Sequence, residues 1–136
     1  MRSLIIAMAL ILSGCTTVKN TWDAYFMAKF DVNEYQYITR IRTHAQLGIP
    51  KCGTPEVVEH VKYIYVAANE YKNYSEMIPK NEDSHRLATT LTDITDDFYK
   101  RYQGDKAPST VYCKAKFAAI ERSSENIQRV IGAKPR

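Results

Sequence analysis

The sequence lacks the local patterns on which most enzymes and cofactor proteins depend. It has no Cys-x-x-Cys-His haem attachment motif, and the pair Ser123-Ser124 lacks the flanking glycines of a nucleophile elbow. His44 and His85 fall at predicted helix ends, where we interpret them as surface histidines. These absences predict a protein that has no enzymatic activity and holds no cofactor.

A metal site is also not expected. Glu56 and His60 are four residues apart, a spacing at which two side chains of one helix can ligate the same ion. A di-metal helical bundle needs a matching pair and further carboxylates on other helices. We therefore interpret Glu56 and His60 as an ordinary surface pair.

The chain has no internal repeat, no low-complexity tract and no strand-like alternation of apolar and polar residues. Its 19 Lys and Arg residues stand against 15 Asp and Glu residues, and both signs are interspersed. Nucleic-acid binding requires a dense basic surface, so this diffuse charge argues against it. We expect residues 133–136 to form a solvated basic tail, with contact to lipid headgroups as the alternative.

The first residues have the composition of an export signal. Arg2 precedes an apolar run over residues 4–12, which is too short to span roughly 30 Å of hydrocarbon. The run ends in Leu12-Ser13-Gly14-Cys15, which resembles the lipobox of bacterial lipoprotein precursors. This resemblance implies a signal peptide over residues 1–14 and a lipid on the thiol of Cys15.

The residue after Cys15 gives an expected location. Thr16 occupies the position where lipoproteins retained in the inner membrane typically carry aspartate. The resemblance therefore implies an anchor at the periplasmic face of the outer membrane, with residues 15–20 as the lipidated tether. An ordinary secretory signal with a chance cysteine is the alternative.

Cysteine is scarce, and of the three in the chain Cys15 is assigned to the lipid. The exported side of the inner membrane is oxidising, so we expect Cys52 and Cys113 to form a disulfide. Closing a loop of about 60 residues stabilises a fold by roughly 4 kcal/mol in the chain-entropy model. Two free thiols or a metal pair are the alternative, but the flanking residues offer no further ligands.

Apolar residues recur every three or four positions in four segments, as one face of a helix requires. The first predicted helix covers about 20–47 and would end at Gly48 in the left-handed conformation. Asp31 and Glu34 indicate either a kink in this helix or a new start at Asp31.

The other three helices have clear start and stop residues. They are predicted from Thr54, as the N-cap before Pro55, to about Met77, from Asn81 to Gly104, and from Ser109 to Gly132. Their expected buried faces are Val57, Val61, Ile64, Ala68 and Tyr71; Leu87, Leu91, Ile94, Phe98 and Tyr102; and Cys113, Phe117, Ile120, Ser124, Ile127 and Ile131.

Four amphipathic helices with short connections predict an all-α fold, a small antiparallel four-helix bundle over residues 21–132. In this topology the second and fourth helices start at the same end. Cys52 and Cys113 would therefore meet at the end far from Cys15.

Aromatic residues form a class without an assigned role. Most of the ten tyrosines fall at the margins of the helix faces, where tyrosine either covers a small core or contacts a partner. A further cluster precedes the break at Asp31 and could pack on the bundle, rest on a membrane or line a groove for a partner helix: Trp22, Tyr25, Phe26 and Phe30.

The order of the elements and the placement of Cys52-Gly53 and Cys113-Lys114-Ala115 give a second resemblance. Over roughly residues 35–131 the chain resembles the helical pilotins of type II secretion systems, which escort secretin subunits by gripping a C-terminal helix. The resemblance implies no catalysis and a hydrophobic groove with this lining: Phe26, Phe30, Tyr37 and Ile41.

The leading hypothesis is therefore a non-enzymatic outer-membrane lipoprotein that binds an envelope protein by gripping a helix. The alternative is a phage- or plasmid-encoded lipoprotein of the exclusion or lysis type, which occludes an envelope receptor or channel. A ligand- or metal-binding bundle is the third hypothesis.

Overall fold

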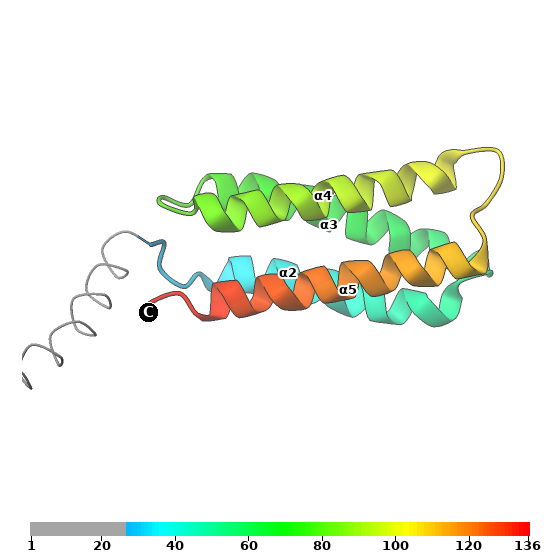
Figure 1. Cartoon of the computed structure of the whole chain (residues 1–136). Coiled ribbons are helices and arrows are strands. Elements are labelled where there is room, and N and C mark those ends of the chain that lie inside the picture. The colour runs from blue at the N-terminus through cyan, green and yellow to red at the C-terminus, as the bar shows by residue number, and fades with distance from the viewer. Residues whose placement is uncertain (1–26) are drawn as a thin grey trace, which may run out of the picture.

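The computed structural model describes residues 27–136. Within them the chain forms α2 (Val32–Gly48), the 3-10 turn η1 (Ile49–Lys51), α3 (Val57–Glu76), α4 (Glu82–Gln103) and α5 (Thr110–Gly132), and no strand (Figure 1). The all-α prediction is confirmed for this part of the chain. The signal peptide, Cys15, the tether and the residues Trp22, Tyr25 and Phe26 lie outside the described residues.

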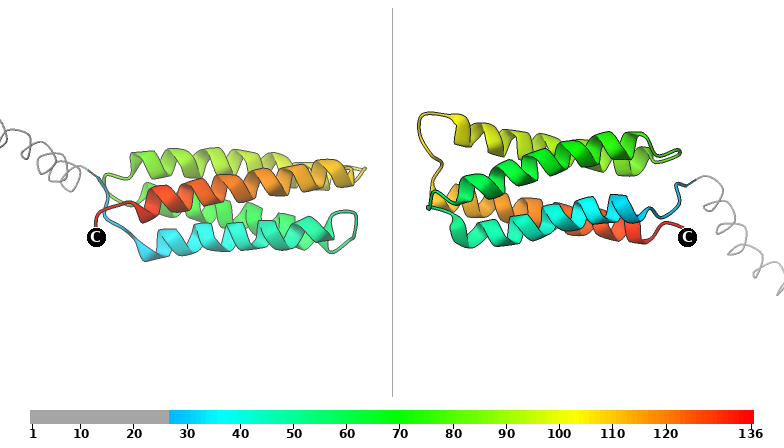
Figure 2. Two further views of the ribbon diagram at one scale, coloured as in Figure 1. Left: turned by 60° about the horizontal axis from the view of Figure 1, so that its bottom comes forward. Right: turned by 180° about the vertical axis from the view of Figure 1, so that it is seen from behind.

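The helices form an antiparallel four-helix bundle in which successive helices run in opposite directions (Figures 1 and 2). α2 packs against both α3 and α5, and α4 packs against α3 and less closely against α5. None of the helices between residues 27 and 136 combines the length and the hydropathy needed to cross a membrane.

The predicted disulfide is present. Cys52 follows η1, Cys113 lies in the first turn of α5, and their Cα atoms are 5.8 Å apart across the S–S bond. The end of η1 and the start of α5, which carry these cysteines, lie at the end of the bundle opposite to the start of α2 and the C terminus (Figure 1). Because 61 positions separate the two cysteines, the bond joins the first half of the chain to its last helix.

Among the described residues, helix α2 begins later than a single helix over 20–47 would require, so the prediction of one continuous helix is wrong. Residues 27–31 are not helical, and Asp31 is the N-cap of α2, where its carboxylate accepts hydrogen bonds from the amides of Asn33 (2.8 Å) and Glu34 (2.9 Å). The alternative start at Asp31 is therefore confirmed. The Asp31 side chain binds the first free amides of the helix, which in a continuing helix would bind the carbonyl groups of the preceding turn. The helix therefore starts here, and the backbone of Asp31 is extended.

Two other helix boundaries were predicted incorrectly. α3 begins at Val57, because the Thr54 hydroxyl donates to the Lys51 carbonyl oxygen (2.9 Å) and closes a turn where an N-cap was expected. Gly48 does not take the left-handed conformation (φ −74°), and α2 continues directly into η1. The left-handed residue of this turn is Gly53 (φ +93°).

The predicted core faces of α3 and α5 are buried throughout. On α4 the prediction is only half right, because Leu87, Ile94 and Tyr102 are half-buried, whereas the small residues Ala88, Thr92 and Thr95 lie in the core. The Thr92 hydroxyl donates to the carbonyl oxygens of Ala88 (2.9 Å) and Ala68 (3.0 Å), so it can be buried against α3. An apolar pattern alone does not reveal a threonine that is satisfied in this way.

Candidate functional site

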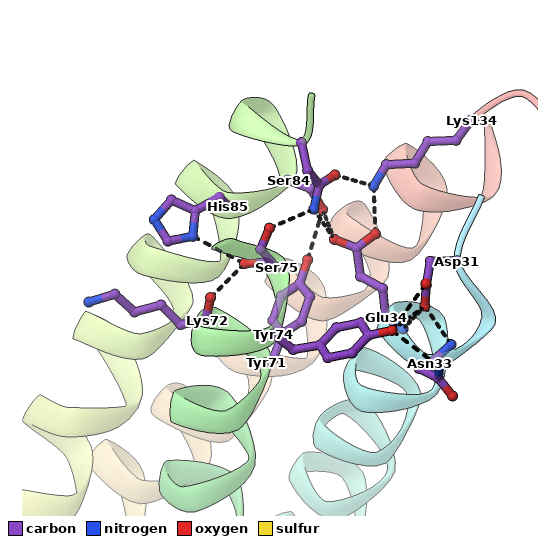
Figure 3. A network of polar contacts seen from close by, with 11 residues as sticks. Asp31, Asn33, Glu34, Tyr71, Lys72, Tyr74, Ser75, Ser84, His85 and Lys134 are labelled. Carbon is purple, nitrogen blue, oxygen red and sulfur yellow. Dashed lines mark hydrogen bonds and ion pairs between the residues drawn. The ribbon is translucent and has the colours of Figure 1, made fainter. Parts of the chain in front are cut away.

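A buried carboxylate organises the end of the bundle that lies next to residue 27. Glu34, in the first turn of α2, has no exposed surface. Its Oε1 accepts hydrogen bonds from Ser84 Oγ (2.5 Å) and Asn81 Nδ2 (2.8 Å), and its Oε2 pairs with Lys134 Nζ at 2.5 Å (Figure 3). A buried charge has lost its contact with water, so it is stable only when it is paired and hydrogen-bonded in this way.

Further polar groups extend this cluster across α3 and α4. Tyr71 and Ser84 share a hydrogen bond of 3.1 Å, Asn81 Nδ2 also donates to the Ser75 carbonyl (3.1 Å), and Ser75 Oγ contacts His85 Nδ1 (3.2 Å) (Figure 3). Burial raises the pKa of the Tyr71 hydroxyl, which therefore stays protonated. The polar atoms of this cluster are occupied by one another, so the cluster holds the helix ends in place.

The C-terminal residues are docked, which corrects the prediction of a solvated basic tail. Lys134 is 7% exposed, and its Nζ contacts Asn81 Oδ1 (2.5 Å) as well as Glu34. The Phe30 amide donates to the Pro135 carbonyl (2.8 Å), and the Arg136 guanidinium lies 5.7 Å from the centre of the Phe30 ring.

The residues before α2 are held from the other side as well, since the Ala28 amide donates to the Lys80 carbonyl (3.1 Å). We call residues 28–31 together with residues 134–136 the clasp. The clasp joins the two ends of the described chain and holds both against the same end of the bundle.

A second region lies along the outer side of α2 and α3. Tyr37 and Tyr74 pack at a centroid distance of 5.5 Å, and they line a shallow hollow of about 190 Å³ with Asn33, Gln36 and Arg40. Nearer the disulfide end, the rings of His44 and Tyr63 are stacked at 3.6 Å.

Large apolar side chains stay exposed on the same two helices. The exposed fractions are 52% for Leu47, 37% for Tyr63 and 43% for Val66. Leu47 follows His44 by three positions, and Val66 follows Tyr63 by three positions, so each pair lies on one side of its helix. We call this region the α2–α3 face, with these members: Tyr37, His44, Leu47, Tyr63, Val66 and Tyr74.

The structure does not bring the predicted partner-binding residues together in one groove. Ile41 has no exposed surface and belongs to the core, so it cannot line a binding surface in this fold. Phe30 is half-buried in the clasp, Tyr37 is half-buried on the α2–α3 face, and Phe26 lies outside the described residues.

Glu56, directly before α3, and His60 within it have separate close contacts in the structure. Glu56 pairs with Lys51 at 2.6 Å, which holds the pKa of the Glu56 carboxyl below its ordinary value. The other glutamate and histidine at helical spacing, Glu82 and His85, begin α4, and His85 Nδ1 is directed to Ser75. Within residues 27–136 no three His, Cys, Asp or Glu side chains are grouped closely enough to hold an ion.

Sequence analysis missed three features of these sites. Glu34 continues the spacing of Ile38, Ile41 and Ala45, so its position on the buried face of α2 was visible in the sequence. His44 precedes the turn between α2 and α3 by about as many residues as His60 follows it. Two antiparallel helices bring such positions side by side. The docking of Lys134 has no comparable signal.

No protein family model, no curated protein and no solved structure matches this chain.

Proposed function

We propose that the protein is a non-enzymatic lipoprotein, anchored through Cys15 at the periplasmic face of the outer membrane, which binds a helix of an envelope protein. The location rests on the lipobox-like Leu12-Ser13-Gly14-Cys15. The observation that carries the binding role is the α2–α3 face, where aromatic and aliphatic side chains stay exposed.

The dimensions of the α2–α3 face suit a helical partner. The eleven positions from Tyr63 to Tyr74 rise about 16 Å along α3, which corresponds to about three turns of a partner helix. A helix bound in this way places an apolar side chain every three or four residues against its receptor. Tyrosines suit such a receptor because they offer a large rigid surface at a small entropic cost.

The clasp supports the role of a tethered module. Thirteen positions separate Cys15 from Ala28, where the amide is held by the Lys80 carbonyl. A fully extended chain of that length reaches at most about 45 Å. A bundle anchored at Cys15 would therefore search only a thin layer next to the membrane for its partner.

Site-specific photocrosslinking of the full chain in native envelopes tests the binding role. A photoreactive amino acid is placed at Leu47 or Val66 on the α2–α3 face, and at Val111, which is 79% exposed at the start of α5, as the control. We expect one shared crosslinked protein at Leu47 and Val66 that is absent at Val111. Equal products at all three positions, or none at any, would contradict the proposal.

The identity of the crosslinked protein separates the first two hypotheses. A secretin subunit supports the escort function of a pilotin, whereas an envelope receptor or channel supports occlusion.

The anchor is tested separately by Cys15→Ser. This variant removes the thiol that would carry the lipid, so we expect an unprocessed and mislocalised precursor without incorporated palmitate. Unchanged labelling with palmitate would refute the proposed location and leave the crosslinking result unaffected.

A further inference from the structure

Two histidines from different helices face each other on the α2–α3 face. His44 on α2 and His60 on α3 bring their Nδ1 atoms to 3.4 Å, with ring centroids 5.5 Å apart. Both side chains are half-buried, and the ring of Tyr63 is stacked on His44 at 3.6 Å. Two helices and a stacked ring therefore hold the nitrogen atoms in place.

This separation fits a tetrahedral metal ion. With Zn–N bonds of about 2.0–2.1 Å and tetrahedral angles, two ligand nitrogens are about 3.3–3.4 Å apart. The two Nδ1 atoms already have this spacing, so an ion can bind both without a change in their separation. We propose that His44 and His60 bind one Zn²⁺ ion through their Nδ1 atoms.

The pKa of His44 suits a metal ligand. Desolvation by burial, followed by the proximity of His60, lowers the pKa of His44, which favours the neutral imidazole that binds metals. Without metal, one Nδ1 donates its proton to the other across the 3.4 Å contact. In the bound state this proton has moved from Nδ1 to Nε2 of the same ring, so both rings are neutral Nε2–H tautomers and both Nδ1 atoms are free to bind the ion.

The neighbouring charged groups leave the site open on one side. Glu56, one turn before His60, is engaged by Lys51 at 2.6 Å, and the part of the chain that the structure describes offers no third His, Cys, Asp or Glu ligand. Water therefore completes the tetrahedron, as in zinc sites that keep open positions. This inference does not depend on the partner proposed above.

Nuclear magnetic resonance locates the ion directly. The full chain, produced without a histidine tag and labelled with ¹⁵N, has three histidines, all of which give side-chain nitrogen signals. On addition of Zn²⁺ at pH 7.5 we expect large shifts of the Nδ1 signals of His44 and His60. His85 is the internal control, because its Nδ1 contacts Ser75 and should not respond.

Calorimetry with variants tests whether both histidines are required. We expect one Zn²⁺ per chain, weakened at least tenfold by His44→Gln or by His60→Gln and unchanged by His85→Gln. Circular dichroism identifies any variant that is unfolded. If a variant is unfolded, the Nδ1 shifts of the wild-type protein still decide whether His44 and His60 bind the ion. Absence of shifts at a tenfold excess of Zn²⁺, or binding that survives both replacements, would overturn the proposal.

Discussion

Gly48 lies so close to the Phe117 ring that a side chain there has no room. A Cβ atom at this position would come within 2.3 Å of the ring. Since Phe117 has no exposed surface, the ring cannot move out of the way into solvent. A glycine that sequence analysis assigned to the end of a helix is therefore required for the contact between α2 and α5.

Gly48→Ala should consequently destabilise the fold. Overpacking of a core costs about 1–3 kcal/mol, and the better helix propensity of alanine returns at most about 1 kcal/mol. We expect a lower free energy of unfolding in urea. Gly132→Ala is the matched control, because its Cβ would lie 3.9 Å from the Tyr35 ring, and it should be neutral or slightly stabilising. An equal response of both variants would contradict this account of Gly48.

The ion pair of Glu34 and Lys134 is a second feature of single residues. Lys134→Met leaves the fully buried Glu34 carboxylate without its cation, and the loss of one partner of such a pair costs about 3–5 kcal/mol. We expect this loss in chemical unfolding, whereas Lys114→Met, at an exposed position, should have almost no effect.

The double variant Glu34→Gln with Lys134→Met provides the test of mechanism. It removes the buried charge along with its partner, so it should recover part of the stability that Lys134→Met loses. A double variant that is less stable than Lys134→Met alone would show that the packing of the lysine stem, and not the charge, dominates.

Among the elements, α2 depends most clearly on its first residue. The Asp31 carboxylate caps the helix and also accepts a hydrogen bond from the Tyr74 hydroxyl at 3.0 Å, so it fastens α2 to α3. Loss of an N-cap costs about 0.5–2 kcal/mol.

Asp31→Ala should therefore reduce the stability by about 1–2 kcal/mol. Asp31→Asn retains an oxygen acceptor and should stay close to the wild type. Thermal and urea unfolding of the three proteins provide the measurement. If asparagine proves as harmful as alanine, the negative charge matters more than the cap.

The elements were predictable to the extent that local residues define them. Gly104 and Ser109 mark the end of α4 and the start of α5, because helix boundaries there depend on neighbouring backbone groups. The start of α3 was misplaced, since the Thr54 hydroxyl had a second acceptor, the Lys51 carbonyl, that the sequence does not reveal. The orientation of α4 was half missed because Thr92 is buried through a contact with another helix.

For the molecule as a whole, the disulfide is the feature that sequence reasoning predicted best. The expected lipidation of Cys15 left two cysteines for a disulfide, and the antiparallel topology brings both to one end. The docking of Lys134 against Glu34 could not be foreseen, because 100 positions separate the two residues and Lys134 carries no local signal of pairing.

Replacement of both cysteines by serine, Cys52→Ser with Cys113→Ser, tests the contribution of the bond. A loss of roughly 4 kcal/mol, the chain-entropy value for a loop of this size, should lower the melting temperature by roughly 10 °C or more. Reduction of the wild-type protein should reproduce the shift, which serves as the control. Equal melting temperatures in oxidised wild type and variant would mean that the bond adds no net stability.

The clasp also determines where the protein can be modified without interference. Because Pro135 and Arg136 contact Phe30, a reporter fused behind Arg136 would emerge beside Phe30, near the first described residues. It would crowd the clasp and disturb Lys134, which pairs with Glu34. The exposed loop over residues 104–107 lies at the other end of the bundle, so a label inserted there would point away from the clasp (Figure 1).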